Sequence, residues 1–347
     1  MIRFGKSAQD ILGFKKDFFE SNDRIRDDLL RINKLYAKQP RRFLCKLCTH
    51  KLPATPKFKA HEVEYLVCSR CGHLNGAYED TAEFCNAVYA EESGSKYART
   101  YHSDDRDAYF QRIEQIYTPK AKFMIDALRE QGMNPKELSY ADLGAGSGYF
   151  VGALRGSDLD RVIGYEVSQA QVDLASHMLA GRFVEQHALD DLDAIIQGLK
   201  CEVVSMVGVL EHVRHPREVL ARLSENKNVK FLYISVPLFS TSVFIEMVFP
   251  MVMPRHLAAA HTHLFTESSL NWMAGEFKMH RVAEWWFGTD IMDLFRSMTV
   301  MLQKSPQTRE VAAEWQALFA PLLDDLQIVL DKRKLSSEVH ALFRFQR

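Results

Sequence analysis

The sequence predicts an α/β protein in which a doubly wound, mostly parallel sheet of seven strands is preceded by a small zinc ribbon. Three observations carry this prediction. Strands and helices alternate from about residue 110, a glycine-rich loop follows the first of these strands, and two cysteine pairs precede them. Strands that alternate with helices of this length pair in parallel through right-handed crossovers. We therefore expect at least two structural units within the 347 residues.

Four regions follow one another along the chain. Residues 1–42 place apolar residues at helical spacing and predict a helical segment. Residues 43–78 hold the cysteine pairs, and residues 79–109 form a polar connector rich in tyrosine. The α/β domain is expected over residues 110–347, with an insert at 237–265 and a helical insert at 289–333.

Hydrophobic periodicity and turn residues predict the elements of the α/β domain. A helix over 111–132 ends near Gly132 and Pro135. The seven expected strands cover residues 138–144, 160–168, 182–186, 201–209, 229–237, 279–288 and 336–345, and further helices cover 148–156, 168–181, 215–226 and 266–277.

Composition and charge narrow the possible partners. The formal net charge is −1, and the one short basic cluster, from Lys38 to Lys46, is expected to flank a fold. Nucleic-acid binders carry a concentrated basic surface, so nucleic acid is not the expected partner. The charged first 20 residues predict no secretory signal. The apolar stretch 236–254 contains three prolines and Glu246, which favours a buried or lid segment over a membrane span, so we expect a cytoplasmic protein.

The glycine loop "DLGAGSGYF" predicts a nucleoside-binding site between a strand and a helix. Its glycines are on alternate positions, so the third glycine of the dinucleotide fingerprint would fall on Tyr149. Asp142, at the end of the strand, would repel a pyrophosphate but suits the amino-acid end of S-adenosylmethionine. Glu166, 20 residues after Gly146, is placed to accept both ribose hydroxyls. A nicotinamide oxidoreductase is therefore disfavoured.

Four motifs in the same order, "DLGAGSGYF", "GYEVS", "HALDDL" and "VVSMVGVLEHVRHPREVL", resemble those of class I S-adenosylmethionine-dependent methyltransferases. The resemblance covers about residues 110–290 and implies a Rossmann-like methyltransferase sheet that binds this cofactor. It implies that Asp142, Gly144 and Gly146 line the methionine end and that Glu166 binds the ribose. The other implied cofactor contacts are Ala145 and Val167, His187, Ala188 and Leu189 at the adenine, and Gly208 and Val209 at the pocket floor.

Two C-x2-C pairs, Cys45 with Cys48 and Cys68 with Cys71, predict a zinc site. Four cysteine ligands leave no open coordination position, so this zinc would be structural and would supply folding energy to a region with little core. His50, His61 and His73 are possible substitute ligands, but four well-spaced cysteines make them unnecessary. Cys85 and Cys201 are expected to be small buried hydrophobic residues.

A zinc ribbon, a tyrosine-rich connector and a class I core together resemble nucleotide-sugar C-methyltransferases and methyltransferases from surface-polysaccharide gene sets. This resemblance implies a nucleotide-activated sugar or a polysaccharide precursor as the acceptor. The chain departs from the C-methyltransferases in two ways. It lacks their large C-terminal α/β domain, and it has His261-Thr262-His263 where their active-site segment reads His-Glu-His. O- and C-methylation therefore both remain open.

Four residues are candidate catalytic groups, because methyl transfer needs a base or a lone pair delivered in line. Glu211 and His212 follow the fourth strand of the sheet, and His261 and His263 lie on the insert, where positions two apart can face one side. In the resembled family the histidine matching His263 is the proton acceptor. Further side chains that could face the same space are Tyr97, Tyr101, Tyr117 and Lys120.

Two other functions remain open at this point. Some ribosomal-RNA methyltransferases also place a zinc ribbon before this core, although the lack of a basic stripe counts against RNA. A non-catalytic protein that binds S-adenosylmethionine would serve assembly or regulation, although the intact glycine loop and its acids count against it. The sequence does not predict the oligomeric state.

Overall fold

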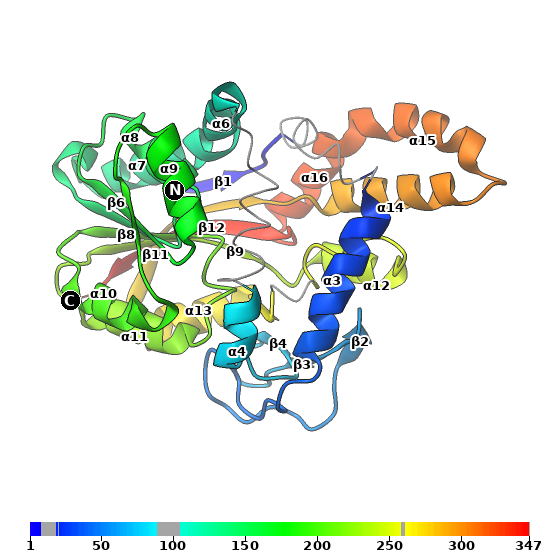
Figure 1. Cartoon of the computed structure of the whole chain (residues 1–347), viewed down its shortest axis with the longest axis horizontal. Helices are drawn as coiled ribbons and strands as arrows, with labels where there is room; N and C mark the ends of the chain where they lie inside the picture. Colours follow the sequence, from blue (N-terminus) through cyan, green and yellow to red (C-terminus); the bar gives the residue numbers. More distant parts are fainter. Residues whose placement is uncertain (8–18, 20, 89–104, 258–260, 347) are drawn as a thin grey trace.

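The computed structural model describes residues 1–7, 19, 21–88, 105–257 and 261–346, and its main feature is an eight-stranded sheet (Figure 1). The strand order is β1-β11-β12-β9-β8-β5-β6-β7. Strands β5 to β9 run parallel, whereas β12 is antiparallel to both of its neighbours. The strands are β1 (Ile2–Phe4), β5 (Tyr140–Leu143), β6 (Val162–Glu166), β7 (Val184–Gln186), β8 (Val203–Val207), β9 (Phe231–Pro237), β11 (Met279–Phe287) and β12 (Glu338–Phe345).

The predicted α/β class is confirmed, and all seven expected strands are present. The eighth strand, β1, pairs in parallel with β11 and comes from the segment that we expected to be helical. The guanidinium group of Arg3 lies 4.1 Å from the centre of the Trp285 ring, and the amino terminus donates to the carbonyl of Val282. A strand of three residues is too short for a period-2 pattern to predict it.

Two hydrophobic clusters cover the opposite faces of the sheet. Trp285 and Trp286 are consecutive and fully buried, yet they belong to different clusters, because successive side chains of a strand point to opposite faces. Tyr233 and Ile234 on β9 divide in the same way. The helices α7 (Thr118–Glu130), α8 (Tyr149–Arg155) and α9 (Gln169–Met178) pack on one face, and α10 (Leu192–Gly198), α11 (Pro216–Glu225) and α13 (Glu267–Glu276) pack on the other.

A second, four-stranded antiparallel sheet combines the cysteine region with the insert. Its order is β10-β4-β3-β2, and β10 comes from the insert nearly 190 residues after its partner β4. The backbone amide of Gly76 also donates to the carbonyl of Thr262 at 2.8 Å. The sequence predicted the two parts separately, because a two-residue strand has no readable pattern. The strands are β2 (Phe58–Ala60), β3 (Val63–Val67), β4 (Leu74–Gly76) and β10 (His263–Leu264).

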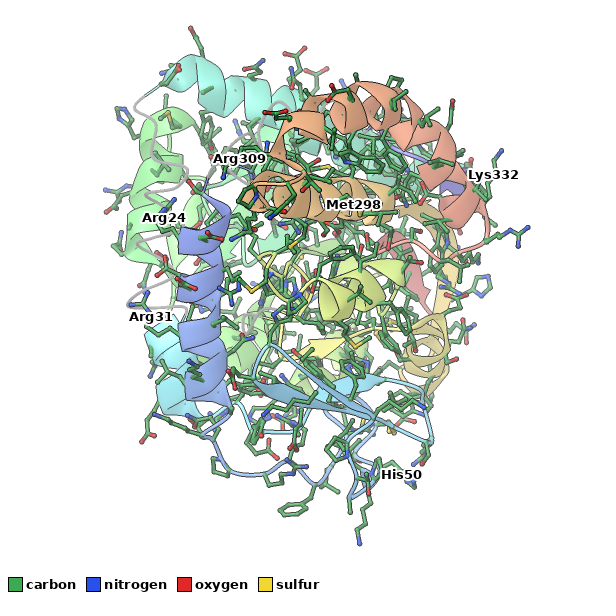
Figure 2. The ribbon with its side chains drawn as sticks, turned by 90° about the vertical axis from the view of Figure 1, so that its right-hand side faces the viewer. Arg24, Arg31, His50, Met298, Arg309 and Lys332 are labelled. Carbon is green, nitrogen blue, oxygen red and sulfur yellow. The ribbon has the colours of Figure 1, made fainter. Side chains whose placement is uncertain are left out.

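Helix α3 (Asn22–Tyr36) extends from the small sheet towards the C-terminal helices, with Arg24 and Arg31 on its outer side (Figures 1 and 2). Asn33 donates to the carbonyls of His61 and Leu257 at 2.7 and 3.2 Å. At its other end, Asn22 donates to the carbonyl of Met251. The helix therefore fastens the small sheet to the insert.

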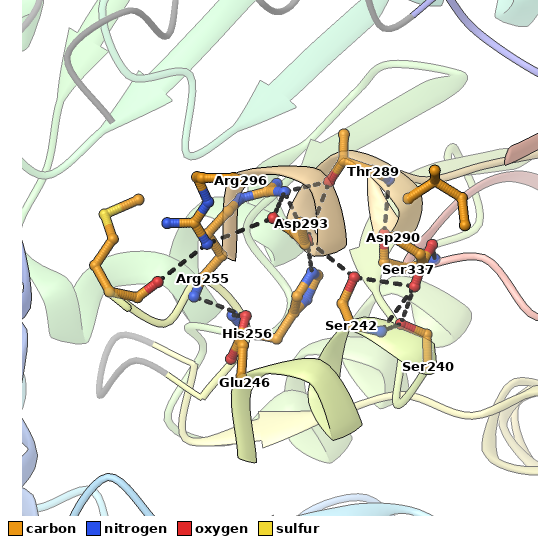
Figure 3. A network of polar contacts seen from close by, with 12 residues as sticks. Ser240, Ser242, Glu246, Arg255, His256, Thr289, Asp290, Asp293, Arg296 and Ser337 are labelled. Carbon is orange, nitrogen blue, oxygen red and sulfur yellow. Dashed lines mark hydrogen bonds and ion pairs between the residues drawn. The ribbon is translucent and has the colours of Figure 1, made fainter. Parts of the chain in front are cut away.

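The C-terminal helices α14 (Asp290–Lys304), α15 (Ala312–Phe319) and α16 (Leu323–Lys332) form an arm that joins the insert through a buried polar network (Figures 1 and 3). Asp290 accepts hydrogen bonds from Ser240 and from the amides of Ser242 and Ser337. Burial alone would raise the pKa of Asp293, but Arg255 and then Arg296 lower it to about 2.

The remaining helices are short. The segment 236–254 contains the end of β9 and α12 (Thr241–Val248), and none of the helices that the structure describes is long and apolar enough to cross a membrane. The others are α4 (Ala82–Cys85), α6 (Arg106–Arg112), a π-helical turn (Ile113–Tyr117) and 3-10 turns at Pro135–Glu137, Leu189–Asp191, Arg309–Val311 and Ala320–Leu322.

The crossing of β6 and the glycine loop leads to a prediction about stability. A Cβ atom at Gly164 would lie 2.7 Å from the Cβ of Ala145 and 3.0 Å from Val151, inside the core. Gly164→Ala should therefore lower the free energy of unfolding by about 1–3 kcal/mol through overpacking. Gly275→Ala, on α13 with open space around it, is the control and should be neutral or stabilising by up to about 1 kcal/mol. Denaturant unfolding of both variants tests this, and equal effects would contradict it.

Candidate active site

The glycine loop lies at the carboxyl end of β5, between β6 and β8. The chain continues outward from β5 in one direction through β6 and β7, and in the other through β8 and β9. This reversal is the point at which open α/β sheets bind ligands. Gly144, Gly146 and Gly148 have φ angles of 71°, 55° and 76°, which side chains rarely adopt. A Cβ atom at Gly144 would also lie 2.6 Å from Val209.

Two carboxylates flank the loop. Asp142 is 2% exposed and accepts a hydrogen bond of 2.6 Å from the hydroxyl of Ser205. Burial raises the pKa of Asp142 to about 7, although the Ser205 hydrogen bond acts in the opposite direction. Glu166 accepts from the amides of Gly146 at 2.8 Å and Ser168 at 2.9 Å. One carboxylate therefore follows each of two adjacent strands, as the sequence predicted from their spacing.

The other expected cofactor residues follow the neighbouring strand ends. The amide of His187 donates to the carbonyl of Glu166 at 3.0 Å, and its exposed ring contacts the carbonyl of Ala188. Gly208 has a φ angle of 69° directly after β8. The expected residues thus gather along the carboxyl ends of four adjacent strands: Asp142, Gly144, Ala145 and Gly146 after β5, Glu166 and Val167 after β6, His187, Ala188 and Leu189 after β7, and Gly208 and Val209 after β8.

Three of the four catalytic candidates lie together. One ligand atom from each of Glu211, His212 and His261 lies within 4.8 Å of the other two. The rings of His212 and His261 are 5.0 Å apart, centre to centre. Burial raises the pKa of Glu211 to about 8, whereas burial and then His212 hold the pKa of His261 well below its usual value. The loop after β8 and the insert therefore meet at these side chains.

His263 lies in another environment. It is fully buried in β10, and its Nδ1 atom is 2.8 Å from Nε2 of His73 in the cysteine region. Burial and the charge of Lys46 hold the pKa of His263 well below its usual value. The expectation that both insert histidines face one side therefore has a different outcome, because His261 precedes β10 and only His263 is within the strand.

Thr262, between these histidines, belongs to a buried network that the sequence analysis missed. The ammonium group of Lys46 donates to Thr262 at 3.1 Å and to the carbonyl of Val213 at 3.0 Å, and it is paired with Asp80. Thr262 donates in turn to Asp80 at 3.0 Å. Lys46 had been assigned to a flanking basic cluster, and its distant acidic partner left no local signal.

The four paired cysteines are buried, and their sulfur atoms lie within 4.8 Å of one another. The Cys45–Cys71 and Cys48–Cys68 sulfur distances are 3.7 and 3.4 Å. Thiolates about 2.3 Å from one tetrahedral zinc lie about 3.8 Å apart, so the donor set and its spacing fit this ion. The possible substitutes lie elsewhere: His50 is exposed, His61 contacts the carbonyl of Glu246, and His73 pairs with His263. Cys85 and Cys201 are buried, as expected.

Aromatic and charged residues border the glycine loop on its other side. Tyr117 stacks on Tyr149, with 5.3 Å between ring centres, and the hydroxyl of Tyr109 donates to the carbonyl of Ser147 at 2.7 Å. Lys120 lies 3.7 Å from Glu338 at the start of β12. Sequence analysis missed Tyr109 and Glu338, because neither belongs to a motif. Tyr97 and Tyr101 fall outside the described residues.

Comparisons with known proteins place this arrangement in a family. A family model described as a methyltransferase domain matches residues 104–278, just over half of the chain. A comparison with curated proteins finds no match. Among solved structures, magnesium protoporphyrin IX methyltransferase (ChlM) from Synechocystis PCC 6803 with bound SAH is 13% identical, with 77% of this chain and 100% of that chain covered and a TM-score of 0.49. The plantazolicin methyltransferase BpumL in complex with SAH is 14% identical, with coverages of 76% and 94% and a TM-score of 0.46. By the family match, the chain belongs to the methyltransferase-domain family and is an S-adenosylmethionine-dependent methyltransferase.

Proposed function

We propose that the chain transfers the methyl group of S-adenosylmethionine to a small acceptor, a nucleotide-activated sugar or a related surface-polysaccharide precursor. One observation carries the proposal: the glycine loop with its two carboxylates lies at the switch point of the sheet, and Glu211 and His261 lie beyond β8 on the same side. A cofactor at the loop would present its methyl group towards these side chains.

In this proposal each part of the loop binds a different part of the cofactor. Asp142 attracts the ammonium group of the methionine end. Glu166 uses two hydrogen bonds to hold the loop, and its carboxylate oxygens keep further lone pairs for the ribose hydroxyls. His187, Ala188 and Leu189 border the adenine, and Gly208 and Val209 form the floor.

Two observations favour a small acceptor over RNA. The formal net charge of −1 provides no excess of cations for a phosphate backbone. The insert, which in class I enzymes covers the acceptor, is here fixed to the cysteine region through β10 and β4. This pairing of ribbon and insert agrees with the resemblance to sugar methyltransferases, in which both parts occur.

The chemistry needs the acceptor atom in line with the methyl group. The new bond to the methyl carbon forms as the carbon–sulfur bond breaks, and the electron pair of that bond returns to sulfur. The acceptor atom loses its proton. Glu211, whose pKa is about 8, and the neutral imidazole of His261 are placed to receive it.

We also propose that Cys45, Cys48, Cys68 and Cys71 hold a structural zinc. The ion would supply folding energy to a small sheet with little core of its own. The residues that it would fix include His73, which contacts His263 of the insert.

Cofactor binding should depend on pH through Asp142. Its pKa is about 7, so lowering the pH from 8 to 6 protonates it and removes the attraction for the ammonium group. Only about a tenth of the carboxyl groups stay ionised at pH 6, so the dissociation constant should rise by up to about tenfold. Calorimetric titration with S-adenosylmethionine measures this. Asp142→Asn should bind more weakly at pH 8 and lose the pH dependence, and a tightening of the unmodified protein at pH 6 would contradict the assignment.

Zinc should be lost from the ribbon when one ligand is removed. Metal analysis of the purified protein should give one zinc per chain, and Cys68→Ser should lose most of it, because a thiolate is replaced by a hydroxyl. Cys201→Ser, a buried cysteine outside the group, is the matched control and should keep the metal. Full zinc content in Cys68→Ser would refute the site.

The two insert histidines should differ in their effect on turnover. A panel of nucleotide-linked sugars and labelled S-adenosylmethionine identifies the acceptor, with RNA as the competing candidate. With that acceptor, His261→Ala should lower turnover by roughly 10² to 10⁴ while cofactor affinity stays unchanged. His263→Ala should have a smaller effect, because His263 contacts His73 and lies apart from Glu211. The reverse order would assign the proton acceptor to His263, as the family resemblance implies.

A further inference from the structure

We propose that Glu211, His212 and His261 form a second metal site, which takes a divalent first-row transition ion and holds the acceptor. The use of the ion in catalysis rests on the proposed methyl transfer. The site itself rests on the three side chains and is open to a separate test.

The three side chains have the composition of a metal centre. Two imidazoles and one carboxylate, with the remaining coordination positions open, are a common ligand set for catalytic zinc and non-haem iron. The potential ligand atoms lie within 4.8 Å of one another, and the Glu211 Oε1 to His212 Nε2 distance is 3.9 Å. Ligand atoms on one ion are about 3–3.4 Å apart. Small side-chain rotations would close the site.

Unpartnered polar atoms point independently to a bound cation. Within the part of the chain that the structure describes, Glu211 Oε2 and His261 Nδ1 are buried and have no hydrogen-bond partner. Glu211 is only 3% exposed, so solvent contributes little to its carboxylate. Buried polar atoms without a partner are rare and cost about 1–3 kcal/mol each. One cation between these atoms would satisfy both.

The dipeptide Glu211-His212 alone would not make a site. The third ligand is the decisive one, because His261 comes from the insert, about 50 residues later in the chain. Two anchors hold the insert close to the loop after β8. β10 pairs with β4, and Lys46 links Thr262 to the carbonyl of Val213.

This site differs in chemistry from the group of four cysteines. Four thiolates close the coordination shell of a zinc, whereas three nitrogen and oxygen ligands leave positions for water and an acceptor. Imidazole and carboxylate ligands suit Mn²⁺, Fe²⁺, Co²⁺ and Zn²⁺ rather than Ca²⁺. The two sites can therefore be loaded with different ions.

The open positions indicate the acceptor's chemistry. A hydroxyl group, or two neighbouring oxygens of a sugar, can bind the ion and lose a proton more readily because of its charge. The resulting oxygen attacks the methyl carbon, an oxygen–carbon bond forms, and the carbon–sulfur bond breaks with its electron pair left on sulfur. The proton goes to water. The site thus favours O-methylation over C-methylation.

Manganese binding tests the proposal. Zinc-loaded full-length protein is titrated with Mn²⁺, and free Mn²⁺ is followed by electron paramagnetic resonance. We expect one Mn²⁺ per chain in addition to the cysteine-bound zinc. Glu211→Gln, which keeps the size of the side chain, and His261→Ala should each weaken binding at least tenfold. His280→Ala removes an exposed histidine on β11 and should leave binding unchanged.

Zinc content and thermal unfolding of each variant show whether it is folded. No bound Mn²⁺ in the unmodified protein, or equal binding in both site variants, would overturn the metal site. Calorimetry with S-adenosylmethionine is run on the same samples. If the cofactor binds but Mn²⁺ does not, the metal site fails and the proposed methyl transfer remains. If the cofactor does not bind, the proposed function fails whatever the Mn²⁺ result.

Discussion

The acceptor side of the site depends on the pairing of β10 with β4. This two-residue contact joins the insert to the cysteine sheet. The buried Lys46, Asp80 and Thr262 network strengthens it, and Lys46 also reaches the carbonyl of Val213, just after the Glu211-His212 loop. A buried ammonium group is stable only when it is paired, so these partners must stay together. The position of His261 beside Glu211 follows from this constraint.

Sequence reasoning predicted the cofactor side of the site well. Glycines at positive φ and an acid 20 residues later are local signals, because one strand, loop and helix carry them. The seven core strands were also predictable, since their apolar runs are long enough to read. β1 was not, because its three residues are stabilised by contacts with β11, such as Arg3 on Trp285.

The acceptor side could be predicted only in part. Glu211, His212 and His261 were each recognised as candidates, but their meeting depends on how the insert folds back, which no local pattern encodes. His263 was placed with them by the alternation rule, which applies within a strand. β10 begins only at His263, and a partner for that residue, His73, comes from the distant cysteine region. Long-range contacts of this kind leave no spacing to read.

The insert is fixed on its other side as well, by charges rather than by strand pairing. The carboxylate of Glu246 accepts hydrogen bonds from three consecutive amides, those of residues 255–257, at 2.8 to 2.9 Å. Arg255 in turn pairs with the fully buried Asp293 of α14 (Figure 3). Removing one partner of such a pair costs far more than the pair contributes, since an uncompensated charge remains buried. His261 therefore lies between two anchored segments, one held by the arm and one by the cysteine sheet. An acceptor site built in this way would inherit its geometry from both ends of the chain, which explains why a methyltransferase core of ordinary strand order needs the added ribbon and arm.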